Sequence, residues 1–261
     1  MRILRAQQRS DDAARAVEVP PHPALREYYD ATASRQGFLN ELFDRTAYRY
    51  RTVDKVVAFG SGLWHRRRAL RKAGLRPGMR VLDVACGPGL TTQCALDVIG
   101  PTGHVIGLDP SSGMLREARK GPCRSLIQGI GEELPFPDCT FDFLSMGYAL
   151  RHVSDLHVAF REYRRVLKPG GIILLLEISR PRSPALLSVT RFYIRTVMGA
   201  AFARATGNPD MRTLMQYWWD TTEQCVAPED ILAALCDVGL VQCEAKEIFS
   251  GLIRDYRAVR A

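Results

Sequence analysis

The residues with the clearest chemical potential lie in Asp83-Val84-Ala85-Cys86-Gly87-Pro88-Gly89, where an apolar run ends in a glycine-rich turn. Glycine is needed where a ligand approaches the backbone closely, and a turn that opens a helix suits a polar ligand. Asp83 is costly in an apolar strand unless its carboxylate orients the loop or binds a cation. Asp109 ends the next predicted strand, where an acid can bind both ribose hydroxyls of an adenosine. These residues predict a cofactor site of the nucleoside type.

Two other interpretations of this turn stay open. It can be a tight strand–helix connection with no ligand, since a lone Gly-x-Gly is a weak signal. It can also belong to a nicotinamide dehydrogenase, but the third glycine that such an enzyme uses beside the pyrophosphate is here Thr92. A cofactor without a pyrophosphate fits the pattern better.

Alternating strands and helices must position these residues. After Gly74, short apolar runs that end in Gly, Asp or Glu predict strands over 80–85, 105–109, 125–128, 141–146 and 172–178. Helices are expected between them, including 111–120 and an amphipathic helix over 154–167 that stops at Lys168-Pro169-Gly170-Gly171. Apolar strands of this kind are typical of parallel sheets buried on both faces. The predicted fold class is therefore α/β, with a doubly wound, mostly parallel sheet that places ligands at the carboxyl ends of its strands.

The remaining segments are assigned from composition and periodicity. Residues 1–28 are polar and then proline-rich, which predicts a flexible N-terminal arm before a single domain over 29–261. A helical pattern covers 25–71, and an insertion over about 181–227, rich in aromatic and apolar residues, is expected to cap the strand ends. The tail over 241–259 is expected to supply two closing strands, one of them antiparallel.

The composition excludes several classes of protein. The 261 residues are 46% hydrophobic and 25% charged, which is typical of a globular chain. No apolar run is long enough to cross a membrane, and the N-terminus lacks the apolar stretch of a secretory signal, so a cytoplasmic protein is predicted. The seven cysteines are scattered without a Cys-x-x-Cys pair, which argues against a metal site or a disulfide framework. Most of the +8 net charge comes from dispersed arginines, so no nucleic-acid partner is expected.

The glycine turn resembles that of the class I S-adenosylmethionine-dependent methyltransferases. Further segments resemble the ubiquinone/menaquinone C-methyltransferase family: Phe43-Asp44-Arg45-x-Ala47, Tyr50, Leu134-Pro135-Phe136-Pro137-Asp138, Phe141-Asp142, Leu150-Arg151, Val166-Leu167-Lys168-Pro169-Gly170-Gly171 and Leu176-Glu177-x-Ser179-Arg180-Pro181. The resemblance implies S-adenosyl-L-methionine as cofactor and a seven-stranded Rossmann-like methyltransferase fold. It also implies a small hydrophobic or aromatic acceptor, with C-methylation of a quinone-type compound favoured.

The resemblance further implies which residues hold the cofactor. In the family, the segment matching 83–89 cradles the methionine moiety and the acid matching Asp109 holds the ribose. Gly129 is followed here by Ile130 and Gly131, so backbone groups or Glu132 are left to contact the adenine. The predicted cofactor contacts are Tyr50, Asp83, Ala85, Gly87, Gly89, Asp109, Pro110, Ile130, Gly131 and Met146.

The methyl acceptor needs a second group of residues, and the predicted catalytic residues are Arg151 and His152. Both follow the predicted strand over 141–146, close to Tyr148. A reference histidine titrates at about 6.5, so His152 could remove a proton from the acceptor. Arg151 matches a family arginine placed near the acceptor and could favour a phenolate or enolate, while Glu177 closes the fifth strand toward the same pocket. In the alternative interpretation, Arg151 and His152 only fix the loop before Ser154, the predicted N-cap of the next helix.

Other functions and contacts stay open on sequence alone. They are O- or N-methylation of a secondary metabolite, a catalytically silent subunit that binds S-adenosylmethionine, and the dehydrogenase. The stretch over 186–205 mixes apolar residues with arginines, so it could make a transient membrane contact or pack as a cap on the domain. The sequence predicts no oligomeric state.

Overall fold

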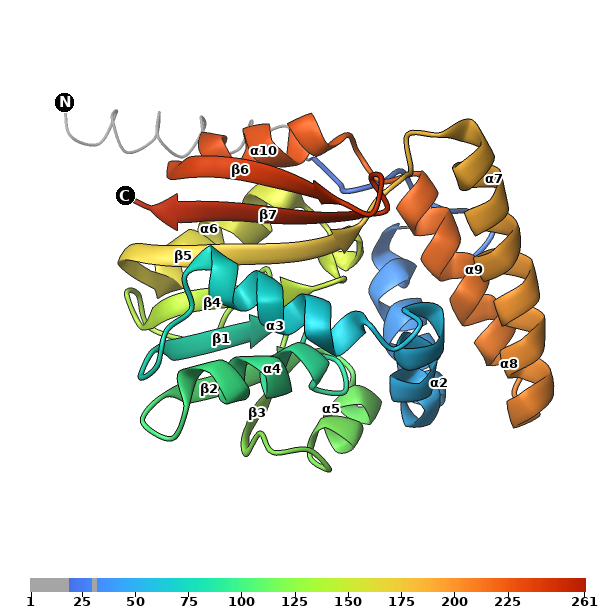
Figure 1. Cartoon of the computed structure of the whole chain (residues 1–261), viewed down its shortest axis with the longest axis horizontal. Coiled ribbons are helices and arrows are strands. Elements are labelled where there is room, and N and C mark those ends of the chain that lie inside the picture. The colour runs from blue at the N-terminus through green and yellow to red at the C-terminus, as the bar shows by residue number, and fades with distance from the viewer. Residues whose placement is uncertain (1–18, 30–31) are drawn as a thin grey trace.

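The predicted apolar runs form one seven-stranded sheet in the order β3-β2-β1-β4-β5-β7-β6, seen in the computed structural model, which describes residues 19–29 and 32–261 (Figure 1). Strands β1 to β5 are parallel, and β7 runs antiparallel to both β5 and β6. The predicted fold class is confirmed. The strands are β1 (Arg80–Val84), β2 (His104–Asp109), β3 (Ser125–Gln128), β4 (Phe141–Gly147), β5 (Leu167–Ile178), β6 (Leu240–Ile248) and β7 (Ile253–Arg260).

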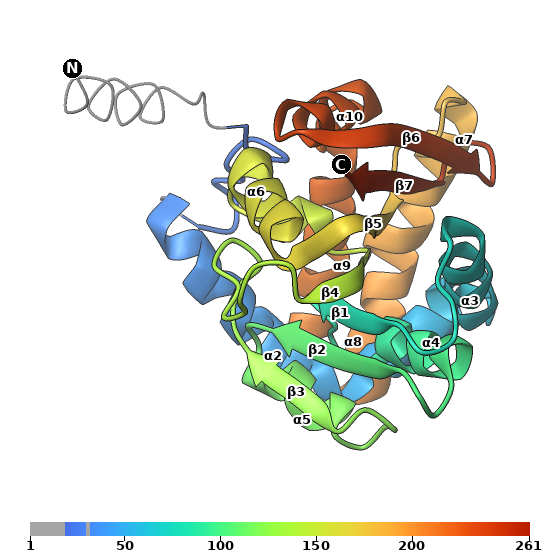
Figure 2. The same ribbon diagram turned by 90° about the vertical axis from the view of Figure 1, so that its left-hand side faces the viewer.

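Helices cover both faces of the sheet and the carboxyl ends of its parallel strands (Figures 1 and 2). Helices α3 and α4 lie on one face, and α6 and α10 lie on the other. Helices α2 and α7 to α9 stand at the strand ends. The helical elements are α2 (Thr32–Val57), α3 (Gly62–Ala73), α4 (Leu90–Ile99), α5 (Ser112–Ala118), the 3-10 helix η1 (Leu150–His152), α6 (Leu156–Val166), α7 (Pro184–Arg191), the π-helix η2 (Phe192–Met198), α8 (Gly199–Thr206), α9 (Asp210–Glu223) and α10 (Pro228–Asp237).

Side-chain alternation along the strands produces two cores. In β1, Leu82 and Val84 pack toward α6 and α10, whereas Val81 packs toward α3 and α4. In β5, Leu175 and Leu174 divide in the same way. Both faces of these strands are therefore apolar, as parallel strands between two helical layers require. A third core joins α2 to η2, α8 and α9 at the strand ends.

Several local predictions were wrong, each for a physical reason. The helical pattern over 25–71 splits into α2 and α3, because the chain turns at Phe59 and Gly60, which both have positive φ. The N-cap of α6 is Asp155, whose side chain accepts a hydrogen bond from the Val158 N–H, and not Ser154. Strand β5 begins at Leu167 rather than at Ile172. Residues 168–171 bulge out of the sheet between the pairs Phe141–Leu167 and Phe143–Ile172.

The described part of the predicted arm is anchored to the domain. The Val19 N–H donates to Asp155 Oδ2 at 2.6 Å, and the Pro21 carbonyl accepts from the Val226 N–H at 2.8 Å. Leu25 and Tyr29 are buried against the core at the strand ends. Residues 19–29 are thus part of the packed body, and the rest of the predicted arm, over 1–18, lies outside the described residues.

Candidate functional site

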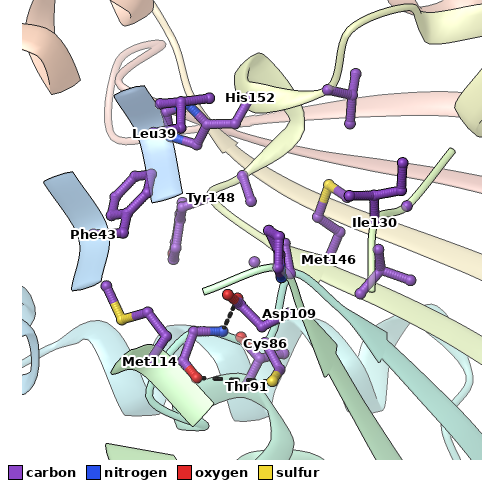
Figure 3. A pocket seen from close by; sticks show the side chains of 18 of the residues that line it. Leu39, Phe43, Cys86, Thr91, Asp109, Met114, Ile130, Met146, Tyr148 and His152 are labelled. Carbon is purple, nitrogen blue, oxygen red and sulfur yellow. Dashed lines mark hydrogen bonds between the residues drawn. The ribbon is translucent and has the colours of Figure 1, made fainter. Parts of the chain in front are cut away.

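Two adjoining cavities lie at the carboxyl ends of the strands. The first is lined by the glycine turn after β1, the end of β2, the segment around Ile130, the end of β4 and the underside of α2 (Figure 3). The second, of about 570 Å³, lies between α2, α3, α7, η2, α9 and the β6–β7 turn. Tyr50, Arg66, Gly147 and Tyr148 line both. The arrangement provides two compartments with a common wall.

The glycine turn leaves open space for a ligand at the first cavity. Gly87 has φ +55°, and a Cβ built there meets no heavy atom within 4 Å. Gly89, with φ +83°, serves a different purpose, since a Cβ there would contact Ala118 of α5 at 3.4 Å. Ala85 also has positive φ, at 51°, which is uncommon for a residue with a side chain and is found at functional turns. The turn is thus shaped by backbone conformation that only a few residues adopt readily.

Asp109 lies at the end of β2 and is fixed by two backbone donors. Its Oδ2 accepts from the Gly87 N–H at 2.8 Å, drawn as a dashed line in Figure 3, and its Oδ1 accepts from the Ser111 N–H at 2.9 Å. Burial raises the pKa of Asp109 to about 6, against the opposing effect of the two N–H donors. The carboxylate lines the first cavity and has unused lone pairs for further donors.

Asp83 orients the loop and does not line the first cavity. Its carboxylate accepts from the Thr92 hydroxyl at 2.5 Å and from the Ser145 hydroxyl at 2.7 Å. These bonds tie β1 to α4 and β4, and they give Thr92 a role at the position where a dinucleotide fold has its third glycine. Burial raises the pKa of Asp83 to about 6, although both hydroxyls oppose that rise.

Asp83→Asn is expected to make the protein no less stable at pH 7.5 and to flatten its pH dependence. The folded-state pKa lies above the unfolded value of about 3.9, so ionisation costs stability as pH rises from about 4 to about 6. The amide keeps bonds to both hydroxyls and removes a cost on the order of 2 kcal/mol. Thermal unfolding at pH 5 and pH 7.5 measures the effect, and Asp97→Asn on the surface is the control. If the change in unfolding temperature between pH 5 and pH 7.5 is the same in Asp83→Asn as in the wild type, this role of Asp83 is contradicted.

Asp44, in the Phe43-Asp44-Arg45 motif, fixes α2 over the first cavity. Its Oδ1 accepts from the Ser111 hydroxyl at 2.5 Å and from the Gly113 N–H at 2.7 Å, at the N-terminus of α5. Burial alone would raise the pKa of Asp44, but these bonds outweigh it and the pKa is lowered. Gly113 permits the approach, since a Cβ there would lie 2.8 Å from Asp44 Cα.

Most of the predicted cofactor residues line the first cavity, and two do not. Asp83 and Gly89 lie behind the lining residues. The remaining predicted residues line the first cavity: Tyr50, Ala85, Gly87, Asp109, Pro110, Ile130, Gly131 and Met146. Glu132 lines it too, but its Oε1 already accepts from the N–H and hydroxyl of Ser154. The apolar walls are completed by Leu39, Phe43 and Met114, which were not among the predicted cofactor contacts.

His152 lines the first cavity, but it does not titrate near neutrality as predicted. Its ring stacks on Tyr217 with centroids 5.8 Å apart and meets Phe43 edge-on at 5.3 Å. Burial, with Arg151 and Arg35 nearby, holds the pKa of His152 well below its usual value. Neither ring nitrogen has a hydrogen-bond partner in the described part of the chain. Turnover is therefore not expected to follow an ionisation of His152 near pH 7, and a catalytic role for His152 stays a prediction.

Arg151 lies behind the cavity walls, contrary to its expected place beside the acceptor. Its side chain is fully buried and paired with Glu177, and it lines neither cavity. Its Nε donates to the Thr221 hydroxyl at 3.2 Å, and its Nη1 donates to the Tyr148 carbonyl at 2.9 Å. Glu177, expected to face the acceptor, is engaged in this ion pair. Arg151 therefore supports the segment that carries Tyr148, and its direct role in catalysis stays a prediction.

The second cavity has mostly apolar walls and one polar cluster. Apolar side chains come from α2, α7, η2, α9 and the β6–β7 turn: Val53, Val57, Leu186, Val189, Tyr193, Ile194, Leu214, Met215, Trp218, Phe249 and Leu252. The polar cluster is His65, Arg66, Asp54 and Tyr148, and Arg66 pairs with Asp54 at 2.5 Å. Trp218 alone of the Tyr217-Trp218-Trp219 cluster lines the cavity, and the other two are buried in the core at the strand ends.

The family model of the ubiE/COQ5 methyltransferase family matches residues 31–259. A demethylmenaquinone methyltransferase of Staphylococcus aureus strain JH9 is 34% identical over 174 residues, or 64% of this chain and 72% of that protein. A crystal structure from Thermotoga maritima, of an S-adenosylmethionine-dependent methyltransferase described as a possible histamine N-methyltransferase, gives a TM-score of 0.61 at 19% identity, over 85% of this chain and 100% of that one. Phosphoethanolamine N-methyltransferase 2 of Haemonchus contortus, in complex with S-adenosylmethionine, gives 0.59 at 17% identity, over 87% and 60%. The structural matches support the fold.

Proposed function

Because the chain belongs to the ubiE/COQ5 methyltransferase family, we propose that it methylates a ring carbon of a hydroquinone that carries an apolar substituent. The family makes it an S-adenosylmethionine-dependent methyltransferase, which removes the dehydrogenase alternative. What remains to be proposed is the acceptor, its atom and the roles of individual residues.

S-adenosylmethionine fits the first cavity on two observations. The open space at Gly87 accommodates a ligand against the backbone, and the buried Asp109 carboxylate faces the same cavity. Asp109 would accept from the ribose hydroxyls, and Ile130 and Gly131 would contact the adenine. When bound, the cofactor supplies an electrophilic methyl group on a sulfonium. The chain's own contribution is to align this group with an acceptor and to exclude water.

The observation that carries the proposed acceptor is the second cavity. It is large and mainly apolar, shares a wall with the first, and has its charged groups and Tyr148 in one polar cluster beside that wall. A flat aromatic head with hydroxyl groups would meet the polar cluster, and an apolar tail would lie along α7, η2 and α9. The name of the demethylmenaquinone methyltransferase relative, which is 34% identical, supports an acceptor of the same class.

A label-transfer assay tests the acceptor. Methyl-labelled cofactor is incubated with the protein and demethylmenaquinol, and the product is located by mass spectrometry and NMR. Label on a ring carbon is expected. Label on an oxygen, or on an amine of a metabolite supplied in a cell extract, would favour the O- or N-methylation alternatives. No label on any acceptor would favour the silent subunit.

The tail end of the proposed acceptor would reach the exposed rim of the second cavity. Phe59, Val189 and Phe249 line this cavity and are 83%, 65% and 53% exposed. No helix within 19–29 and 32–261 is long and apolar enough to span a membrane. We include in the proposal a transient contact of this rim with a lipid surface, from which a tailed acceptor would enter. A cytoplasmic location stays a prediction.

Val189→Asp is expected to raise KM for a long-tailed acceptor about tenfold, because losing the burial of a valine costs about 1.5 kcal/mol. KM for an acceptor without a tail should change less than twofold. Val197→Asp on η2, which lines neither cavity, is the matched control. Equal changes for both acceptors would argue against a tail at this rim.

A further inference from the structure

We propose that Tyr148, His65 and Asp255 form a proton relay that ionises the acceptor hydroxyl, with Tyr148 as the residue that touches the acceptor. The inference rests on the proposed function, since it assumes an acceptor with an ionisable hydroxyl. It assigns the base to a cluster away from the predicted pair Arg151 and His152.

The three residues come from distant segments and meet at the wall between the two cavities. Tyr148 follows β4, His65 lies on α3, and Asp255 lies on β7. His65 Nδ1 is 2.8 Å from the Tyr148 hydroxyl, and His65 Nε2 is 3.2 Å from Asp255 Oδ1. Tyr148 lines both cavities, whereas His65 lines only the second. The order is that of a nucleophile–base–carboxylate triad, with a tyrosine in the first place.

The second contact has the right distance but not the alignment of a hydrogen bond. Within the described ranges, His65 Nε2 and Asp255 Oδ1 are buried without any hydrogen-bond partner. The two atoms lie 3.2 Å apart, so a rotation of the imidazole that aligns Nε2–H with Oδ1 would satisfy both. Catalytic hydrogen bonds are often poorly aligned without ligand and tighten when the substrate binds.

The backbone at Tyr148 is held in a conformation that a tyrosine seldom adopts. Its φ is +63°, and its N–H and carbonyl are fixed by Leu176 O at 2.7 Å and by Arg151 Nη1 at 2.9 Å. A bulky residue with positive φ is strained by about 1–3 kcal/mol, and such strain is concentrated at functional sites. Arg151 thus acts in this scheme as a positioning residue for Tyr148.

The charges around Tyr148 favour a protonated hydroxyl that relays a proton over a Tyr148 side chain that is permanently ionised. Burial raises the pKa of Tyr148, and the carboxylates of Asp54, Asp255 and Glu177 add to that rise. The Arg66 guanidinium opposes it from 4.7 Å above the ring. The hydroxyl therefore stays protonated at neutral pH and can accept a proton only if it passes its own to His65.

The proton balance of the step is closed. The acceptor O–H gives its proton to Tyr148 Oη while Tyr148 gives its proton to His65 Nδ1, which leaves an imidazolium facing Asp255. The phenolate so formed directs its ring carbon to the methyl group; the carbon–methyl bond forms as the sulfonium bond breaks. The ring carbon then loses its proton to water and the oxygen regains one from His65 through Tyr148. One proton is released in total.

Kinetics on a series of hydroquinones of graded acidity test the relay. Tyr148→Phe is expected to lower kcat about 10²-fold for the least acidic acceptor, the loss typical of a removed proton-transfer group. The loss should shrink toward none for acceptors already ionised at the assay pH. Asp255→Asn should show the same trend with a smaller loss. Tyr28→Phe removes a hydroxyl bonded to Asp220 outside both cavities and is the control. A loss that is equal across the series, or absent, would overturn the relay.

A second measurement needs no turnover. Nitrogen-15 NMR of labelled histidine should show His65 protonated on Nε2 and unprotonated on Nδ1, and Tyr148→Phe should shift the Nδ1 resonance. A proton on Nδ1, or an Nδ1 resonance unmoved by Tyr148→Phe, overturns the relay even if the variants fold poorly for kinetics. If the wild type methylates no hydroquinone, the proposed function fails, and the relay is then judged by this spectrum alone.

Discussion

Gly87→Val is expected to abolish cofactor binding at ordinary concentrations while the protein stays folded. The position has φ +55°, which a β-branched residue adopts only with strain, and its side chain would project into the first cavity. Overpacking alone costs about 1–3 kcal/mol and occasionally more, so affinity for S-adenosylhomocysteine should fall about a hundredfold or beyond. Isothermal calorimetry measures the change.

The matched control for this variant is Gly100→Val. Gly100 also has positive φ, 69°, with open space at its Cβ, but it follows α4 and lines neither cavity. Both variants should lose comparable stability on heating, and only Gly87→Val should lose the cofactor. If both variants bind S-adenosylhomocysteine equally well, the cofactor does not lie against this turn.

Asp109→Ala is expected to weaken S-adenosylhomocysteine binding about tenfold to a hundredfold, because two ribose hydroxyls lose a charged partner worth about 1.5–3 kcal/mol. Asp109→Asn keeps one carbonyl acceptor and should lose less. Calorimetry on both variants, with thermal unfolding as the check on folding, separates binding from stability. Affinity equal to that of the wild type in the alanine variant would remove Asp109 from the cofactor site.

The raised pKa of Asp109 adds a pH dependence to the same test. With a pKa of about 6 in the free protein, the carboxylate that accepts both hydroxyls is present above that pH and is lost below it. Affinity should therefore be constant at pH 7–8 and fall about tenfold by pH 5. Asp83→Asn should keep a profile of this kind, displaced to lower pH because the Asp83 charge helps to raise the pKa of Asp109, and Asp109→Asn should lack it. The comparison identifies which of the two buried carboxylates is responsible.

Most of the lining of the first cavity could be predicted, because it is built from local sequence signals. The apolar runs before Gly87 and Asp109 define strand ends, and the carboxyl ends of parallel strands meet at one edge of a sheet. Local hydrogen bonds were harder to predict from the sequence. The N-cap of α6 is Asp155 rather than Ser154, because the N–H and hydroxyl of Ser154 donate to Glu132, which is distant in sequence. The spacing of residues does not reveal such competition.

The surroundings of His152, His65 and Tyr148 could not be predicted, because these residues meet their neighbours only in the tertiary structure. The low pKa of His152 comes from burial between Phe43 of α2 and Tyr217 of α9, which no local pattern encodes. Nothing in the local sequence distinguishes His65 on α3 or Asp255 on β7. They come into contact only because β7 pairs with β5. Positive φ at Tyr148 is likewise invisible in sequence, since tyrosine carries no signal for it.

Helix α2 contributes walls to both compartments, and this has a thermodynamic consequence. Phe43 lines the first cavity, Val57 lines the second, and Tyr50 lines both, while Asp44 fastens the helix to α5 beside Asp109. A ligand in either compartment that restricts the motion of α2 lowers the entropy that the second ligand must still lose. If cofactor and acceptor occupy the two compartments as proposed, they are expected to bind cooperatively, and linkage requires each to raise the affinity of the other by the same factor. Substituting Asp44 by a residue that cannot accept hydrogen bonds from α5 is expected to reduce that cooperativity, although position 44 contacts neither ligand.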